Sequence, residues 1–226
     1  MSYMWNEFNI KTFPAETIVY RDGDYCPDLS TIGPGEIEKK YDLPIHIIYV
    51  GEIIDSNELN IEINVENQPV FLSVDVKNKK PAFLNIFIKN TGKKSELRGH
   101  VFIENFSNLE LNIYAGHFEE STGMMLHTKI IGHKNSYSKL TGNAEIMPNT
   151  LDCISDIGFS AILDDTARAE FLPMQHIKSE PKSAEHSASI YKQSPAQIHF
   201  LRMAGLSTDE IRNVAFESFK NDFSLF

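Results

Sequence analysis

The chain of 226 residues is poor in several features that mark common protein classes. It has two cysteines, Cys26 and Cys153, which are too few for a disulfide framework and lie in no paired metal-binding spacing. Lysine and arginine total 21 against 31 aspartates and glutamates, which gives a net charge of −10. This balance argues against a surface for nucleic acid or anionic membrane, because such surfaces are basic. We therefore expect no nucleic-acid partner.

Long apolar runs and nucleotide-binding motifs are also missing. The longest apolar run, Ile45–Val50, is far too short to span a bilayer, and the first seven residues lack the features of a secretion signal. The sequence contains no glycine-rich phosphate loop, no nucleophile elbow and no His-Glu-x-x-His motif. Any ATP-driven role would therefore need a partner. Together these absences predict a soluble, cytoplasmic, acidic protein without a membrane span.

The first two thirds of the chain contain a series of short alternating segments. Each segment places apolar side chains on one face and polar side chains on the other, as in a half-buried strand. The segments are residues 43–55, 60–65, 70–76, 83–88, 100–106 and 109–114. No long amphipathic helix follows any of them, so the sequence predicts an all-β fold rather than a doubly wound α/β sheet.

Three all-β architectures fit this pattern, namely a sandwich, a barrel and a β-solenoid. A strand spacing of about ten residues suits a sandwich. The pattern continues to about residue 192, and asparagine recurs in corresponding places, which suits polar ladders between the stacked rungs of a solenoid. No clean sequence repeat is present, so periodicity alone leaves the choice open.

The N-terminal part is less regular. Residues 2–9 are compatible with a short helix, and residues 17–25 are typical of a hairpin that turns at Asp22-Gly23. We treat residues 1–42 as an N-terminal segment that precedes a strand-rich core over residues 43–192.

Two helices are predicted near the C-terminus. Ser194-Pro195 opens the first, which Gly205 ends, and Ser207–Glu210 opens the second with acidic residues in its first turn. Apolar residues recur at helical spacing in the second helix: Ile211, Val214, Ala215 and Phe219. Residues 193–226 are therefore expected to form a small helical domain.

Two groups of polar residues allow both a chemical and a structural interpretation. His117, His127 and His133 are close in sequence, but spacing cannot show the convergence that a metal site needs, so polar histidines on strands and loops are favoured. Asp164-Asp165 suits a glycoside-hydrolase acid or a turn between strands, and the turn is favoured.

The segment Ala184–Ile190 is more informative. On a strand, His186 shares one face with two small residues, Ala184 and Ala188. These alanines leave space beside the imidazole for another backbone or a ligand. The alternative is a buried histidine beneath the C-terminal helices.

Three segments, taken in order, carry a family resemblance: Ala167–Ile177, Ala184–Ser189 and Gln197–Ser207. They resemble the carboxyl-terminal core of the SufB/SufD family, the iron–sulfur cluster assembly subunits that work with the ATPase SufC. A weaker similarity joins Ile18–Ser30 to the entry segment of SufD-type chains. The strong part of the resemblance covers about residues 150–221.

The resemblance implies a right-handed parallel β-helix followed by a helical domain that docks on SufC, which favours the solenoid. It implies a scaffold rather than an enzyme, with the ATP site in the partner. His186 matches the family histidine at the subunit interface, so it is the candidate residue for metal and for a transient iron–sulfur cluster. The candidate ATPase-binding residues are Ile198, Phe200, Leu201, Met203 and Leu206.

The sequence also departs from the family pattern. SufB-type chains carry a cysteine and an acid at positions that are Ala167 and Ser187 here, and both departures are SufD-like. His176 stands where the family usually has glutamate, and the sequence indicates no role for it or for the two cysteines. Because the chain is shorter than typical members, we expect a minimal member that pairs with itself or with a SufB-like partner.

Two other functions fit the same residues. A carbohydrate-active enzyme on a β-helix or sandwich would need two acids in an open groove. An interaction protein of the same fold, without a cluster role, is favoured by Ala167 and Ser187.

Overall fold

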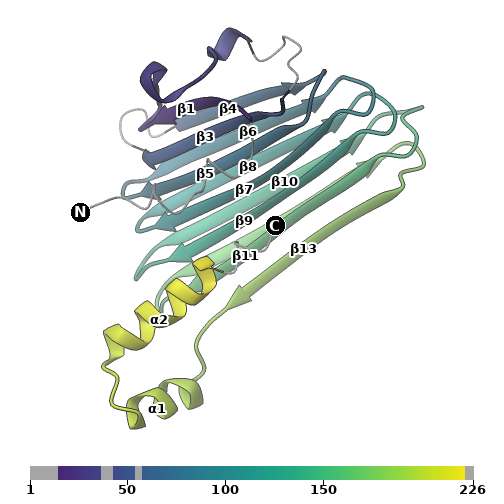
Figure 1. Ribbon diagram of the computed structural model, residues 1–226. Coiled ribbons are helices and arrows are strands. Elements are labelled where there is room, and N and C mark those ends of the chain that lie inside the picture. Colours follow the sequence, from purple (N-terminus) through teal and green to yellow (C-terminus); the bar gives the residue numbers. More distant parts are fainter. Residues whose placement is uncertain (1–14, 37–42, 54–57, 222–226) are drawn as a thin grey trace.

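A computed structural model describes residues 15–36, 43–53 and 58–221, which form a β-solenoid followed by two α-helices (Figure 1). Odd-numbered strands and β2 form sheet A, in the order β13-β11-β9-β7-β5-β3-β1-β2, and even-numbered strands form sheet B, in the order β12-β10-β8-β6-β4. Sheet A contains β1 (Glu16–Arg21), β2 (Asp24–Tyr25), β3 (Ile45–Glu52), β5 (Val70–Asn78), β7 (Glu96–Asn105), β9 (Gly123–Gly132), β11 (Ile154–Leu163) and β13 (Ser183–Tyr191). Sheet B contains β4 (Glu58–Val65), β6 (Ala82–Asn90), β8 (Asn108–His117), β10 (Tyr137–Ile146) and β12 (Arg168–Ile177).

From β3 to β13, consecutive strands alternate between the two sheets, and neighbours within each sheet run parallel. Each coil of the chain therefore adds one strand to sheet A and one to sheet B. The prediction of parallel rungs over residues 43–192 is confirmed, and the solenoid is the correct choice among the three all-β architectures.

The length of a coil varies, which explains why no repeat is visible in the sequence. Glu96 aligns with Gly123, and Gly123 aligns with Ile154, so successive coils differ in length by four residues. The extra residues lie in the turns, where insertions are tolerated, while the paired strands stay in register.

The space between the sheets is filled by the apolar side chains of the alternating segments. Phe159 is 2% exposed and contacts Phe171 at a ring-centroid distance of 5.7 Å. Gly142 on sheet B makes room for it, because a Cβ there would lie 2.7 Å from Cζ of Phe159. The packing between the sheets therefore depends on matched large and small residues.

Asparagine side chains link successive rungs, as the sequence predicted. The Nδ2 atom of Asn78 donates to Oδ1 of Asn105 at 2.8 Å, and Nδ2 of Asn105 donates to Oγ of Ser138 at 2.7 Å. Asn78 and Asn105 are fully buried. On sheet B, a second ladder joins Asn85 to Asn60 and Asn112, at 2.9 and 3.0 Å. Such ladders favour one register between rungs.

The predicted hairpin at the N-terminal end is confirmed. Tyr20 pairs with Tyr25 in antiparallel β1 and β2, and the turn residues Asp22 and Gly23 have φ angles of 55° and 94°. β1 also pairs in parallel with β3, so sheet A begins upstream of residue 43. The predicted helix over residues 2–9 lies outside the described residues.

Helices lie near the two ends of the described chain. η2 (Pro27–Leu29) and η3 (Pro34–Glu36) are short 3₁₀ helices, and α1 (Pro195–Met203) and α2 (Thr208–Asn221) follow β13. Ser194 caps α1 by accepting a hydrogen bond from the Gln197 backbone N–H, and Gly205 has a φ of 93° after it. The predicted helix boundaries are confirmed. No helix in the described part of the chain is long and apolar enough to cross a membrane.

Candidate functional site

The solenoid ends in an open rung formed by β12 and β13. Among the described residues, no strand pairs with the outer edge of either one. Large apolar side chains on this rung are between 40% and 53% exposed: Leu172, Met174, Ile177, Ile190 and Tyr191. A free edge lined with exposed apolar side chains is suited to pairing with another subunit.

His186 lies in the middle of β13, on the side that faces the interior of the solenoid. On β11, Ile157 is aligned with His186, and Phe159 is aligned with Ala188. Ile157 and Phe159 both belong to the apolar core. Because no further rung covers it, His186 is exposed. The imidazole makes no hydrogen bond or ion pair with any residue that the structure describes.

The neighbours of His186 supply few further ligand atoms. Nε2 of Gln175 donates to the backbone oxygen of Glu185 at 2.9 Å and so joins β12 to β13 across the open end. Ser187 lies on the opposite face of β13, aligned with Gly158, and Ala167 offers a buried methyl group. The described residues contain no group of three or more His, Cys, Asp or Glu that could hold a metal ion. One imidazole is too few for a metal centre, so such a site would need ligands beyond those that the described residues offer around His186.

The structure does not bring the other clustered histidines together. His127 lies on the outer face of sheet A, with Nε2 3.0 Å from Oδ2 of Asp156. His133 follows β9 and stacks on Phe106 at a centroid distance of 3.8 Å. His117 lies on a strand, as expected, but it is fully buried at the end of β8.

His117 belongs to a buried chain of hydrogen bonds that also contains Cys153. The hydroxyl of Thr122 donates to the backbone oxygen of Glu119 at 3.1 Å, and it lies within hydrogen-bond distance of Nδ1 of His117 at 2.8 Å and of Sγ of Cys153 at 3.3 Å. Burial lowers the pKa of His117 to about 4. The network therefore holds a neutral imidazole within the solenoid.

The free energy of unfolding is expected to fall as the pH is lowered from 6.5 towards 4. Burial lowers the pKa values of His117, His46 and His100 to about 4, whereas histidines of an unfolded chain titrate near 6.5. Between these values the unfolded chain binds more protons, so the contribution of each neutral histidine is present above pH 6.5 and lost as the pH falls through 4. His117 alone should account for about 2–3 kcal/mol.

Urea unfolding at pH 7 and at pH 4.5 measures this effect, and a His117→Gln variant isolates one histidine. The variant should lose less stability between the two pH values than the wild type does. An identical loss in both proteins would contradict the assignment of a buried neutral imidazole at His117.

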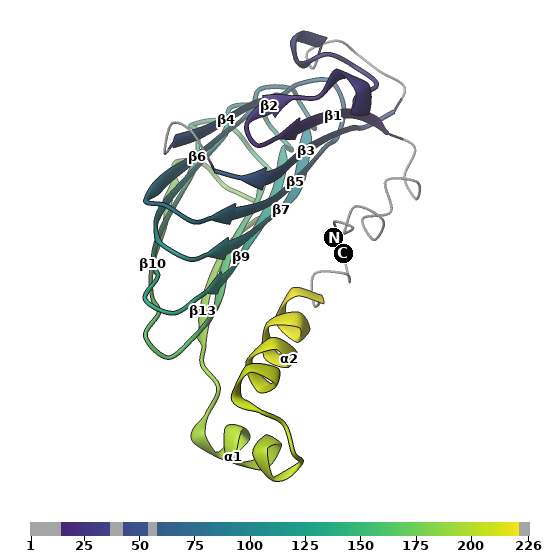
Figure 2. The same cartoon turned by 90° about the vertical axis from the view of Figure 1, so that its left-hand side faces the viewer.

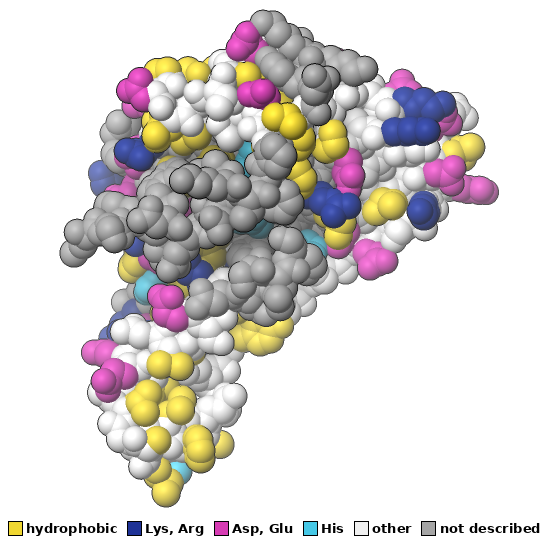
Figure 3. Space-filling model, in the orientation of Figure 1, with side chains coloured by type: hydrophobic (Ala, Val, Ile, Leu, Met, Phe, Trp, Pro, Cys, Tyr) yellow, Lys and Arg dark blue, Asp and Glu magenta, His cyan; other side chains and the backbone are white. Residues whose placement is uncertain are grey.

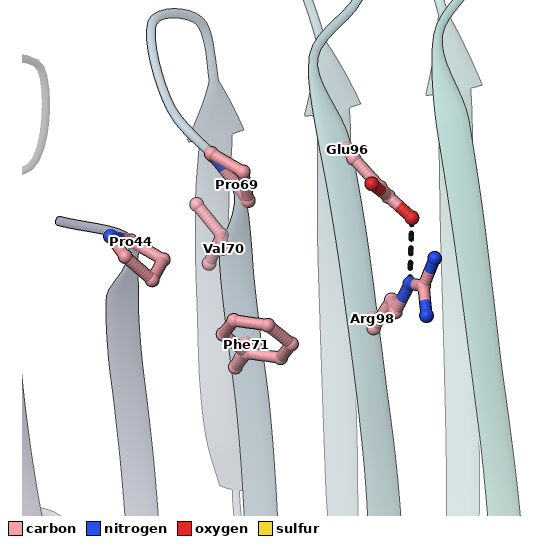
Figure 4. A pocket seen from close by; sticks show the side chains of 6 residues that line it. All are labelled: Pro44, Pro69, Val70, Phe71, Glu96 and Arg98. Atoms are coloured by element: carbon pink, nitrogen blue, oxygen red, sulfur yellow. Dashed lines mark hydrogen bonds and ion pairs between the residues drawn. The ribbon is translucent and has the colours of Figure 1, made fainter. Parts of the chain in front are cut away.

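The two candidate acids of a carbohydrate-active enzyme do not form such a site. Asp164 accepts a backbone hydrogen bond from Ala167 at 3.1 Å, so Asp164-Asp165 forms a turn as predicted. A shallow pocket of about 270 Å³ lies at Pro44, Pro69, Val70, Phe71, Glu96 and Arg98 (Figure 4). Its one carboxylate accepts a hydrogen bond from Nε of Arg98 at 2.6 Å, whereas glycoside hydrolysis needs two carboxylates.

The candidate ATPase-binding residues lie on and after α1, beyond the last rung (Figures 1 and 2). Phe200 and Met203 are 72% and 77% exposed, and Ile198, Leu201 and Leu206 are half-buried. α1 is described along its whole length, and none of its residues is buried. Hydrophobic side chains gather over this helical end in the space-filling view (Figure 3). Such exposure exceeds what packing within the chain requires.

A comparison with known families agrees with this arrangement. The family described as SUF system FeS cluster assembly, SufBD core domain, matches residues 71–219. No curated protein shows a significant match. The matched residues make up more than half of the chain and include His186, α1 and most of α2. The chain therefore belongs to the SufB/SufD family of SUF-system iron–sulfur cluster assembly proteins.

Proposed function

We propose that the chain is a scaffold subunit, rather than an enzyme, of a complex that builds iron–sulfur clusters with a SufC-type ABC ATPase. The observation that carries this proposal is the exposed imidazole of His186 at the open end of the solenoid. Imidazole nitrogen is a suitable ligand for iron, and the cluster is the cargo of the complex.

A second subunit at the open end would complete the site. It would cover the free edges of β12 and β13 and add ligands to the one imidazole that this chain offers. A two-fold homodimer, the commonest closed symmetry, would bring His186 of both copies to the seam. A SufB-like partner would instead supply the cysteine and acid that Ala167 and Ser187 replace here.

The ATPase is proposed to bind the helical end. The sequence has no phosphate loop of its own, so ATP binding falls to the partner. Phe200 and Met203 are exposed apolar residues of α1, and this helix lies beyond the last rung of the solenoid (Figure 2). An ATPase bound there would shift the equilibrium between two arrangements of the subunits in the complex.

A His186→Ala variant tests the proposed role of this histidine. The melting temperature should stay nearly unchanged, because the imidazole is exposed and makes no hydrogen bond with the described residues. Iron and sulfide bound after anaerobic reconstitution should fall to a small part of the wild-type content. His176→Ala is the matched control, because His176 is an exposed histidine on the neighbouring strand β12.

Three results would contradict this proposal. A large fall in melting temperature with unchanged iron and sulfide would make His186 a structural residue. Unchanged melting with unchanged iron and sulfide in His186→Ala would show that this imidazole is not a cluster ligand. No bound iron or sulfide in the wild type would favour an interaction protein of the same fold without a cluster role.

A further inference from the structure

Helix α2 packs across the outer face of sheet A. Phe216, which is 8% exposed, fills a space formed by Phe102 of β7, Ile131 of β9 and Ile162 of β11. The ring of His133 also meets Phe216, edge to face, at a centroid distance of 5.3 Å. One aromatic side chain of the helix therefore contacts three consecutive strands of the sheet.

Charged groups hold α2 at both of its ends. Near its start, the guanidinium of Arg212 lies 3.5 Å from Oδ2 of Asp164, in the turn after β11. Near its end, Nζ of Lys129 donates to the backbone oxygen of Phe219 at 3.0 Å. Lys220 in turn lies over the ring of Phe102, 4.6 Å from its centroid. These contacts fix both the position and the direction of the helix.

The same helix also holds the C-terminal end of β13. The rings of Tyr191 and Phe219 meet at a centroid distance of 6.0 Å. Two residues beyond the strand, Nε2 of Gln193 donates to the backbone oxygen of Ile211 at 3.2 Å.

Nζ of Lys192, one residue beyond the strand, also donates to the backbone oxygens of Asp165 and Ala167, at 3.2 and 3.4 Å. The rest of β13 is held by its ladder to β11 along one edge and by the bond from Gln175. The C-terminal end of the strand is therefore held by two anchors, the turn after β11 and α2.

We propose that α2 is a strap that fixes the end of β13, so that displacing the helix pair loosens the strand that carries His186. An edge strand with one hydrogen-bonded neighbour opens locally at low cost, and contacts at its end suppress that opening. His186 lies five residues before Tyr191 in the same strand. The strap goes beyond the proposed function and does not rest on it, because every contact lies within this chain.

Hydrogen exchange of the full-length chain, read by mass spectrometry, tests the strap. Phe216→Ala removes the central contact of α2, and Val214→Ala is the matched control because Val214 is 53% exposed on the same helix. In Phe216→Ala, amides of residues 184–191 should exchange at least about tenfold faster, while those of β5 keep their wild-type rates. Val214→Ala should match the wild type throughout.

Arg212→Ala provides a second test that leaves the apolar contact intact, because Arg212 pairs with Asp164 in a turn. Hydrogen exchange in α2 and β13 should again be faster than in the wild type, but by a smaller factor than in Phe216→Ala. Faster exchange in α2 with unchanged exchange in β13 would overturn the proposal. Equal acceleration in β5 and β13 would also overturn it, because the effect would then be global. The measurement needs neither ATPase nor cluster, so failure of the proposed function would not affect it.

Discussion

Replacing both Phe200 and Met203 with glutamate is expected to abolish co-purification with a SufC-type ATPase while leaving the solenoid folded. The two side chains are 72% and 77% exposed, so their loss removes little packing within the chain. Two carboxylates placed in an apolar contact would have to lose their hydration without a partner, which costs several kcal/mol in total. Co-expression with the ATPase, affinity purification and a thermal melt measure both expectations.

A matched control uses the same chemistry on another surface. Phe83 and Phe87 of β6 are 49% and 38% exposed on the outer face of sheet B. Their double replacement with glutamate should leave ATPase binding unchanged. Binding retained by the Phe200 and Met203 variant would count against the docking role of α1. The double substitution tests ATPase binding more specifically than removal of residues 194–226 does. That deletion would also remove α2 and expose Phe102, Ile131 and Ile162 on sheet A.

Self-association is the second large effect expected. The wild-type chain should sediment as a dimer at high micromolar concentration, because no described strand pairs with the outer edges of β12 and β13 and the rung carries exposed apolar side chains. Ile177→Lys combined with Ile190→Lys should shift it to a monomer. Both side chains are exposed on this rung, at 46% and 47%, and lysine is a residue that blocks pairing of edge strands.

Val214→Lys is the control for this experiment, since Val214 is equally exposed but lies on α2. It should leave the dimer intact. A wild-type chain that sediments as a strict monomer at the same concentration would contradict the homodimer. In that case the open rung would need a different subunit, such as a SufB-like chain.

The strands, and the face that His186 shares with Ala184 and Ala188, could be predicted because both depend on period-two alternation. Which side of the sheet this face covers depends on the register between strands, because His186 follows its aligned neighbour Ile157 to the interior side. The capping residues of α1 and α2, Ser194 and Ser207, also act locally, and both form the expected hydrogen bonds. Local patterns were sufficient for the strands and the helix caps.

Features that depend on packing between distant segments could not be predicted in the same way. Val214 was expected on the apolar face of α2, yet Phe216 makes the contact, because the sheet offers a space between Phe102 and Ile162 that helical spacing does not reveal. His117 lies inside the solenoid because it ends β8 on the interior side, where Thr122 and Cys153 lie close to it. Thr122 belongs to the turn that follows β8, whereas Cys153 comes from the next coil, and the variable turns hide which residues of successive coils align.

The amount of iron and acid-labile sulfide bound by the dimer, compared with the monomeric variant, shows whether the cluster site forms between two subunits. Both proteins are reconstituted anaerobically in the same way, separated by size and assayed per chain. Iron and sulfide are expected in the wild-type dimer, with little of either in the Ile177→Lys, Ile190→Lys monomer, although His186 is present in both. Equal amounts in the two proteins, or none in the wild-type dimer and in its complex with the ATPase, would contradict a cluster site completed at the open end of the solenoid.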